Sequence, residues 1–423
     1  MNWIALSDLH ISSAPGQFQA HQALGTFLGR VAHTPALSGV VLAGDVLDFL
    51  EFESHHEIVP KKASQRLDDI LSATPNKPIV EGLKAVLEVG RVVVLPGNHD
   101  VELDLPAVQE TMRDLLDADE RLQFEPGGQA FQVTTEHGKA WFTHGNKFDV
   151  WNDIDYAAFR EGATRDPERP QKLCPGSRLV LELMNQFKGD YPWIDRVSHL
   201  PTAVALLWYF EKGSDRVKQA LRRSTGLGPD LLLQSLRRLR RGGMLAAAPA
   251  PHDVLADHLL RAFCPDAPQA LRQEQWFWME SVVTEGIGAA SPGKLAAGGG
   301  ERYWLAVLRH LLEASTPARV EHEDPSHEDP IEHTLKKRVP HDASVVVMGH
   351  THVEKDRPLG DGRYLNLGCW GEQLDIPPFA HDEDLQRWLT ALRANEVPST
   401  RRPTFLTLED ADGLSATLAH ADA

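Results

Sequence analysis

The chain has 423 residues, 42% of them hydrophobic and 24% charged, which are the proportions of an ordinary globular protein large enough for two or three domains. Its formal net charge of -17 argues against a protein that wraps nucleic acid, because phosphate groups would be repelled over most of the surface. No window approaches the ~18 apolar residues of a membrane span, and three scattered cysteines are too few for a disulfide framework or a thiolate zinc site, so we expect a cytoplasmic protein.

The first 153 residues alternate short apolar runs with helical patterns. Five apolar runs predict buried strands: residues 3–6, 39–43, 91–95, 130–134 and 139–142. Helical periods lie near 20–32 and 79–89, and His137-Gly138 separates the last two runs as the turn of a hairpin. This alternation is typical of a layered α/β domain. Because the first strand begins at Trp3, we expect no signal peptide.

From residue 154 to residue 338 the pattern changes to long amphipathic runs. They predict helices over 178–187, 202–210, 231–239 and 303–312, separated by Gly- and Pro-rich stretches. Strand patterns return at 344–348, 364–367, 404–408 and 415–418. We therefore predict a discontinuous core made of residues 1–153 and 339–423, interrupted by a mostly helical insertion of residues 154–338 that acts as a lid or a recognition domain.

Five of the predicted strands are each followed within a few residues by Asp, Asn or His. The clusters are Asp8-Leu9-His10, Gly44-Asp45-Val46-Leu47-Asp48, Gly97-Asn98-His99-Asp100, His144-Gly145 and Gly349-His350-Thr351-His352. One such cluster alone would be read as a turn or a helix cap. In open α/β sheets, however, the carboxyl ends of the strands form the crevice that binds ligands. Five clusters at strand ends therefore predict one shared site.

The side chains in these clusters combine carboxylates, imidazoles and an amide oxygen, with no thiolate. Such donors suit Mn, Fe, Ni or Zn with open coordination positions better than a closed structural zinc. Seven candidate ligands are too many for one ion that must also bind a substrate. We therefore predict two divalent ions, about 3.5–4 Å apart, that share a bridging carboxylate. Manganese is the ion that we expect to work in vitro.

The order of these clusters resembles that of the calcineurin-like metallophosphoesterases. The resemblance covers residues 1–150 and 340–423, and it implies an α/β fold in which a two-sheet β-sandwich is flanked by helices and carries a dimetal centre at one end. The ligands that it implies are Asp8, His10 and His352 for one ion, Asn98, His144 and His350 for the other, and Asp45 as the bridge.

The resemblance also implies roles for three further residues. His99 would protonate the leaving oxygen or stabilise the phosphoryl charge, and Asp100 would orient the His99 ring. Asp48 would accept a hydrogen bond behind the ligands. A hydroxide that bridges the two ions would attack phosphorus. The implied activity is hydrolysis of a phosphodiester, pyrophosphate or phosphomonoester bond in a small molecule or nucleotide, with diesters favoured.

The residues that select the substrate are harder to assign. The candidates for substrate contact are His55, His56, Asn146, Arg237 and Arg241. The two arginines belong to a basic stretch, residues 211–242, with nine Lys or Arg against three Asp or Glu. This stretch would suit a phosphate-rich or nucleic-acid ligand, but it would equally suit a solvated helix face. The two histidines could equally lie in a surface loop.

Two other functions are compatible with the same pattern. One is a nuclease that acts on nucleic acid through the helical insertion. The other is a binding scaffold that keeps the metals without catalysis. Scaffolds of this kind in the family typically lose the motif histidine, whereas His99 and Asp100 are both present in this chain. Phe49-Leu50 stands where the Ser/Thr protein phosphatases of the family carry Arg-Gly, which disfavours that branch.

Overall fold

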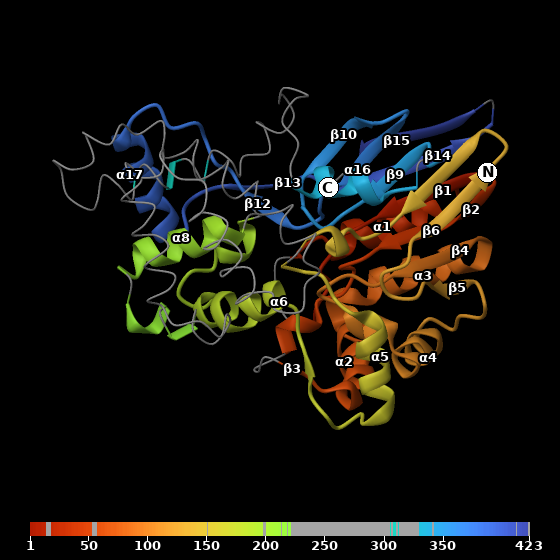
Figure 1. Cartoon of the computed structure of the whole chain (residues 1–423), viewed down its shortest axis with the longest axis horizontal. Helices are drawn as coiled ribbons and strands as arrows, with labels where there is room; N and C mark the ends of the chain where they lie inside the picture. Colours follow the sequence, from red (N-terminus) through yellow and green to blue (C-terminus); the bar gives the residue numbers. More distant parts are fainter. Residues whose placement is uncertain are drawn as a thin grey trace, which may run out of the picture.

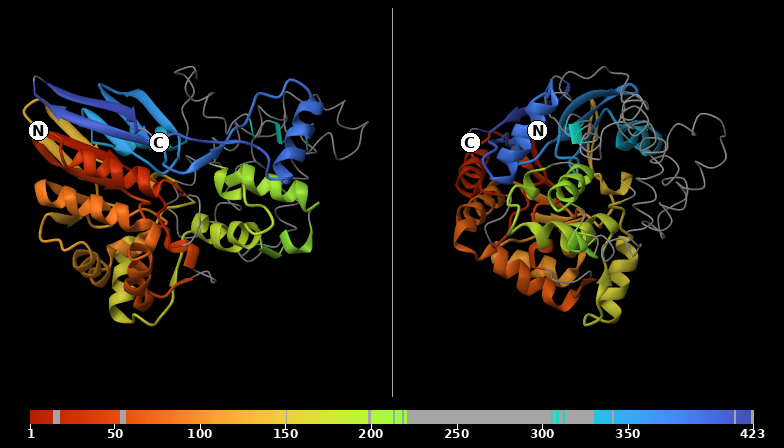
Figure 2. Two further views of the ribbon diagram at one scale, coloured as in Figure 1. Left: turned by 180° about the vertical axis from the view of Figure 1, so that it is seen from behind. Right: turned by 90° about the vertical axis from the view of Figure 1, so that its left-hand side faces the viewer.

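The computed structural model describes residues 1–13, 18–52, 57–149, 151–197, 200–212, 214–217, 219–220, 305, 308–309, 312, 330–340, 342–411 and 413–421. Figures 1 and 2 show two groups of elements: the sheets with helices α1 to α5 on one side, and helices α8 and α17 on the other. None of the described helices is long and apolar enough to cross a membrane.

A six-stranded sheet forms the centre of the first group. Its strands are, in order, β15 (Leu414–His420), β14 (Thr404–Asp410), β1 (Asn2–Leu6), β2 (Leu37–Ala43), β4 (Arg91–Leu95) and β5 (Leu122–Phe124). The four strands from β1 to β5 are parallel, and β14 and β15 extend the sheet in antiparallel fashion. The first strand of the chain, β1, therefore lies beside β14, the strand before the last.

A five-stranded sheet packs against the first. Its strands are, in order, β10 (Glu354–Leu359), β11 (Gly362–Leu367), β9 (Val345–Met348), β7 (Gly138–Phe142) and β6 (Phe131–Thr135). The three central strands are parallel, and β6 and β7 form the predicted hairpin. The prediction of two mixed sheets flanked by helices is confirmed.

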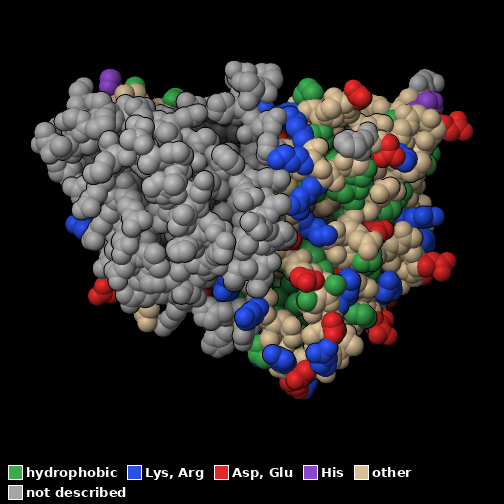
Figure 3. Space-filling model, viewed as in Figure 1, with side chains coloured by type: hydrophobic (Ala, Val, Ile, Leu, Met, Phe, Trp, Pro, Cys, Tyr) green, Lys and Arg blue, Asp and Glu red, His purple; other side chains and the backbone are tan. Residues whose placement is uncertain are grey.

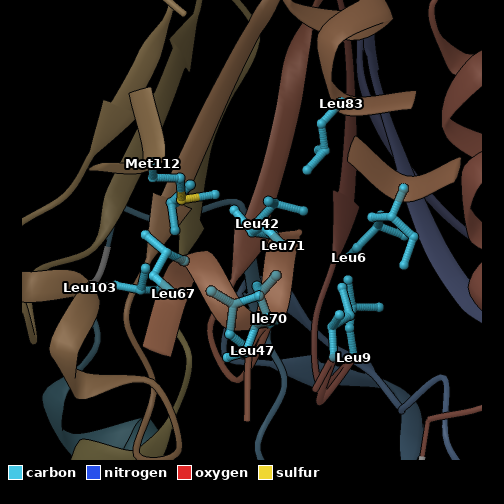
Figure 4. Packing of buried hydrophobic residues seen from close by; sticks show 14 of the residues in the cluster. Leu6, Leu9, Leu42, Leu47, Leu67, Ile70, Leu71, Leu83, Leu103 and Met112 are labelled. Atoms are coloured by element: carbon cyan, nitrogen blue, oxygen red, sulfur yellow. The ribbon is translucent and has the colours of Figure 1, made fainter. Parts of the chain in front are cut away.

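The alternation of side chains along the strands explains the layers. On β1, Trp3 and Ala5 face the second sheet, while Ile4 and Leu6 face the helices on the outside. Helices α1 (His21–Val31), α2 (Ala63–Leu71), α3 (Lys77–Val89) and α4 (Pro106–Leu115) cover that outer face. Figure 4 shows Leu6 and Leu42 of the sheet near Leu83 of α3.

One helix covers the outer face of the second sheet. It is α16 (Pro330–Arg338), and its Leu335 packs with Val346, Met348 and Tyr364. The molecule thus has the helix–sheet–sheet–helix layering of a sandwich, and the carboxyl ends of the parallel strands in both sheets are free to carry loops.

The second group has a hydrophobic core of its own. Its elements are α6 (Pro175–Leu179), a π-helix (Val180–Met184), α7 (Asn185–Phe187), α8 (Leu200–Phe210), β12 (Glu372–Leu374), α17 (Asp382–Arg393) and β13 (Ser399–Arg401). Phe187, Trp193 and Leu206 pack with Leu385 and Trp388 of α17. The segment that contains α17 therefore packs with residues of the predicted insertion rather than with the sandwich.

In the first group, α5 (Tyr156–Arg165) packs against the sandwich, and β3 (Glu57–Ile58) pairs with β8 (Gln171–Lys172). The described residues from 154 to 220 are largely helical. The predicted helix over 231–239 lies outside the described residues, as does most of the one over 303–312. The domain boundaries at 153/154 and 338/339 stay predictions.

Candidate metal centre

The carboxyl ends of parallel strands in both sheets carry the seven predicted ligands. In the first sheet, Asp8 and His10 follow β1, Asp45 follows β2 and Asn98 follows β4; in the second, His144 follows β7, and His350 and His352 follow β9. Five of the seven are buried, and His350 and His352 are partly buried. Side chains more than 340 residues apart in the sequence thus meet at one end of the sandwich.

The first cluster consists of Asp8, His10 and His352. The Nε2 atoms of His10 and His352 are 3.1 Å apart, and His352 Nε2 lies 3.2 Å from Asp8 Oδ1. One donor atom from each residue lies within 4.8 Å of the others. Burial and the nearby charge of His99 lower the pKa of His10 to about 4, so its imidazole is neutral at physiological pH and able to bind a metal.

The second cluster consists of Asp45, His144 and His350, with Asn98 beside it. His144 Nε2 lies 3.3 Å from Asp45 Oδ2 and 3.3 Å from Asn98 Oδ1. On the other side of the ring, Nδ1 lies 3.0 Å from the carbonyl oxygen of Ala43. Because a carbonyl oxygen only accepts, Nδ1 carries the proton and Nε2 is the nitrogen that faces the cluster.

Asp45 also connects this cluster to the loop that follows β4. Its Oδ1 accepts a hydrogen bond of 2.8 Å from the backbone N–H of His99. Burial by itself would raise the pKa of Asp45, but the charges of His144 and His99 hold it well below its usual value. Asp45 is therefore a buried carboxylate that stays ionised, as a bridging ligand must be.

The loops that carry the ligands have strained backbones. The described residues include nine non-glycine residues with positive φ, and five of these are predicted ligands: Asp8, His10, Asp45, His350 and His352. Backbone strain of this kind is typical of functional sites. Glycines allow the close packing, since a Cβ on Gly349 would lie 2.1 Å from Asp8 Oδ2 and one on Gly97 would lie 2.2 Å from Asp45 Oδ1.

The residues around His99 differ in one respect from the expectation. The carboxylate that contacts the His99 ring is Asp48, whose Oδ1 lies 3.2 Å from Nδ1. Asp100 instead accepts hydrogen bonds from the backbone N–H groups of Val46, Leu47 and Gly97. The structure thus gives the contact with the His99 ring to Asp48, whereas the oxygens of Asp100 join the loops after β2 and β4. Burial lowers the pKa of His99, but the charge of Asp45 and the hydrogen bond with Asp48 raise it to about 9.

Asp149 is a further contact of the site, and the sequence predicted no contact between it and a metal ligand. Its Oδ2 lies 3.0 Å from His350 Nε2, and its other contacts are with the backbone N–H of Trp151 and the side-chain amide of Asn152. The signal available in the sequence was its place just after His144. The contact with His350 connects residues 201 positions apart.

Of the five predicted substrate contacts, the structure describes Asn146. Asn146 is buried, and its amide donates to the carbonyl oxygen of Asn152 and to the hydroxyl of Tyr156, so it supports the loop instead of facing a substrate. His55, His56, Arg237 and Arg241 lie outside the described residues.

The described part of the basic stretch includes Arg216. Its guanidinium pairs with Asp190 at the surface and lies 4.2 Å over the ring of Phe187, so Arg216 already contacts other residues of the chain. Figure 3 shows Lys and Arg side chains gathered along the border of the grey atoms, and Lys, Arg, Asp and Glu mixed over the rest of the described part of this face.

The donor set fits divalent cations. The side chains of Asp8 and Asp45 are buried, and buried carboxylates need a counter-charge. The Nε2 atoms of His10 and His352 face each other at 3.1 Å, and a cation between them would accept a lone pair from each. Oxygen and imidazole donors without a thiolate are the ligands of borderline divalent ions.

Residues 1–231, more than half of the chain, match the sequence model of the calcineurin-like phosphoesterase family. The match ends before His350 and His352, which the fold nevertheless brings to Asp8 and His144. No curated protein matched the chain. The match and the His/Asp clusters together indicate a metal-dependent phosphoesterase with a centre for two divalent ions. With more than half of its length matched and these donors at its strand ends, the chain belongs to the calcineurin-like phosphoesterase family.

Proposed function

We propose that the protein hydrolyses phosphodiester or pyrophosphate bonds in preference to phosphomonoesters, in small molecules or nucleotides. The observation that supports this most is the position of His99. Its ring centroid lies 4.6 Å from that of His10, and its backbone N–H donates to Asp45, so a proton donor adjoins both clusters of metal ligands.

Seven side chains would hold two divalent cations: Asp8, His10 and His352 for the first, Asn98, His144 and His350 for the second, and Asp45 for both. Cations bound there would offset the charge of the phosphoryl oxygens and acidify a water molecule. Manganese is the cation that we expect to support activity in vitro, while Fe, Zn or Ni could be the native ions. The strained loops hold the donors in place before a substrate binds.

His99 would donate a proton to the leaving oxygen. Asp48 accepts from Nδ1 and so fixes the plane of the ring, which leaves Nε2 for the substrate. Expulsion of an alkoxide requires this proton, whereas a nitrophenolate can leave without it. The dependence of the rate on the leaving group is therefore the property that reports on His99.

The test is hydrolysis of bis(4-nitrophenyl) phosphate and 4-nitrophenyl phosphate by manganese-loaded protein. We expect the diester to be the better substrate and Asp45→Asn to abolish turnover, because Asp45 belongs to the cluster with His144 and His350 and is the proposed bridge to the other cluster. We expect His99→Ala to lower kcat about 100-fold on a phenyl ester and less on a nitrophenyl ester. Unchanged hydrolysis in Asp45→Asn would contradict the dimetal mechanism. Protein with confirmed metal and no turnover on any ester would instead be a scaffold.

A further inference from the structure

A helix from outside the sandwich lies across the two loops that carry His99 and Asp48. It runs from Pro175 to Phe187 and is followed directly by Lys188, and we call residues 175–188 the bracket helix. Ser177 Oγ donates to the carbonyl oxygen of Asn98 at 3.0 Å. Asn185 Nδ2 donates to the carbonyl oxygen of Leu50 at 3.1 Å. The bracket helix thus holds the backbone of the loop that carries His99 and the backbone of the loop that carries Asp48.

A π-turn within the bracket helix makes these two contacts possible. Ser177 and Asn185 are eight residues apart, a spacing that in a regular α-helix turns one side chain about 80° away from the other. The π-helix of Val180–Met184 adds one residue to a turn and removes most of this rotation. Such turns occur frequently at functional sites. Both side chains are therefore directed to the loops after β2 and β4.

Lys188 is the last residue of the bracket helix, and its side chain pairs with two carboxylates. Its Nζ lies 3.2 Å from Glu51 Oε1 and also pairs with Asp195. The side chain of Lys188 is 29% exposed, and those of Glu51 and Asp195 are 11% and 14% exposed. An ion pair so far removed from solvent is screened less than a surface pair and holds its partners more firmly. Glu51 lies three residues after Asp48, on the same loop.

The charge of Lys188 also acts on Asp48. Burial tends to raise the pKa of Asp48, but the hydrogen bond from His99 and the charges of His99, His10 and Lys188 lower it. The ionised form is the one that accepts a hydrogen bond from the N–H of His99 Nδ1. The charge of Lys188 adds to the larger contributions of His99 and His10 that keep Asp48 ionised.

We propose that Lys188 is a positioning residue of the reaction, which acts through Glu51 and Asp48 to fix the ring of His99. It reaches neither cluster of metal ligands and acts only through other side chains. The role rests on the proposed function, because His99 needs an orientation only if it donates a proton to a substrate. The tests below separate a failure of this role from a failure of the proposed function.

The first test measures leaving-group dependence in Lys188→Met, with methyl aryl phosphodiesters from the nitrophenyl to the phenyl ester. We expect kcat on the phenyl ester to fall about 10- to 100-fold, the usual effect of removing an outer partner. The loss on the nitrophenyl ester should be smaller, KM should hardly change, and Lys188→Arg should restore most of the rate. Lys61→Met, which breaks an exposed pair with Glu168, is the control. Equal losses on all esters would overturn the proposal.

The second test is a double-mutant cycle with His99. If Lys188 acts through His99, Lys188→Met should cause no further loss of kcat in a His99→Ala background. A loss of the same size in both backgrounds would show that Lys188 acts by another route, and the proposal would fall.

A third test does not depend on turnover. In zinc-loaded protein labelled with ¹⁵N, the chemical shift of His99 Nδ1 reports its hydrogen bond to Asp48. We expect this shift to move in Lys188→Met in the same direction as in Asp48→Asn, and to stay constant in Lys61→Met. An unchanged shift in Lys188→Met would overturn the positioning role even in an active enzyme. A wild type that shows the hydrogen bond but hydrolyses none of the esters would instead overturn the proposed function.

Discussion

Asp149 determines which nitrogen His350 offers to a metal. The carboxylate lies 3.0 Å from His350 Nε2 and can only accept, so Nε2 carries the proton. That leaves Nδ1 as the nitrogen for the cluster with Asp45 and His144. Contacts of this kind fix the tautomer of a histidine ligand and make it more basic.

Removal of this carboxylate should weaken metal binding without loss of the fold. We expect Asp149→Ala to lower manganese affinity about 10- to 100-fold, as measured by titration calorimetry of the metal-free protein. Asp149→Asn should lower the manganese affinity less, because an amide oxygen can still accept a hydrogen bond from His350 Nε2. Asp155→Ala, which removes a helix cap on α5 with no histidine in contact, is the matched control. Equal affinities in Asp149→Ala and Asp155→Ala would contradict this role.

Glu102 is a buried carboxyl group that the proposed chemistry does not use. It is 0% exposed, and neither of its oxygens has a hydrogen-bond partner among the described residues. Burial raises its pKa to about 8, although the charge of Arg66 on α2 opposes the shift; Asp100 and Asp48 act in the same direction as burial. Glu102 is therefore neutral in the folded protein at pH 7.

This protonation makes stability depend on pH. Between the ordinary pKa of a glutamate and about 8, the folded state keeps a proton that the unfolded chain has released. The free energy of unfolding should therefore fall by about 1.4 kcal/mol per pH unit over this window, through Glu102 alone. Glu102→Gln removes this fall with pH. The free energy of unfolding of the variant, measured in urea at fixed metal concentration, should therefore rise relative to that of the wild type from pH 5 to pH 8. A difference that is constant with pH would contradict a neutral Glu102; Glu110→Gln, exposed on α4, is the control.

At the scale of elements, α1 and α3 approach closely because each has a glycine at the contact. A Cβ on Gly25 would lie 2.5 Å from the carbonyl oxygen of Pro78, and one on Gly82 would lie 2.7 Å from the Cβ of Leu28. We expect Gly25→Ala to lower the free energy of unfolding, because a clash with backbone outweighs the gain in helix propensity of about 1 kcal/mol.

Gly29 provides the matched control within the same helix. No described atom lies within 4 Å of a Cβ placed there, so Gly29→Ala should raise stability by about 0.5–1 kcal/mol. Chemical unfolding of the two variants should therefore give changes of opposite sign. Two stabilised variants would mean that α1 can move away from α3 at little cost.

The strands that could be predicted from the sequence are those whose residues are apolar because the strand is buried. The strands β1, β2, β4 and β9 are apolar runs buried on both faces, and the sequence predicted all of them within two residues at each end. Strand β10 was missed, because an edge strand alternates half-buried and exposed residues and contains a proline. The packing of α17 against Phe187 and Leu206 has no local signal in either segment.

The same reasoning applies to the candidate site. The donors of the two clusters could be predicted, because parallel strands bring their carboxyl ends to one edge and the donor types are chemically distinct. A helix over 178–187 was predicted, but its contacts with the site were not, because Ser177 and Asn98 are 79 residues apart and a serine on a helix carries no distinctive chemistry. The role of Asp100 was misread, since only the structure shows which backbone N–H groups reach its oxygens.

At the scale of the whole molecule, the candidate metal centre joins the two sheets. Asp8, His10, Asp45 and Asn98 come from loops of the first sheet, and His144, His350 and His352 come from loops of the second. Hydrophobic contacts between the sheets hold the rest of the sandwich. Buried carboxylates at this end repel one another unless a cation is bound.

Metal removal should therefore destabilise the whole sandwich and not only stop turnover. A ligand that binds only the folded state adds about 2.7 kcal/mol to the free energy of unfolding at 100 times its Kd, so we expect the urea midpoint to rise with the logarithm of manganese concentration. His352→Ala should flatten this dependence, because it removes a second-sheet donor from the cluster with Asp8 and His10. His420→Ala, a histidine that pairs with Glu354 on the surface, should leave it intact. The same dependence in His352→Ala as in wild type would mean that manganese stabilises the protein from another place, and the two sheets would then be held together by their apolar faces alone.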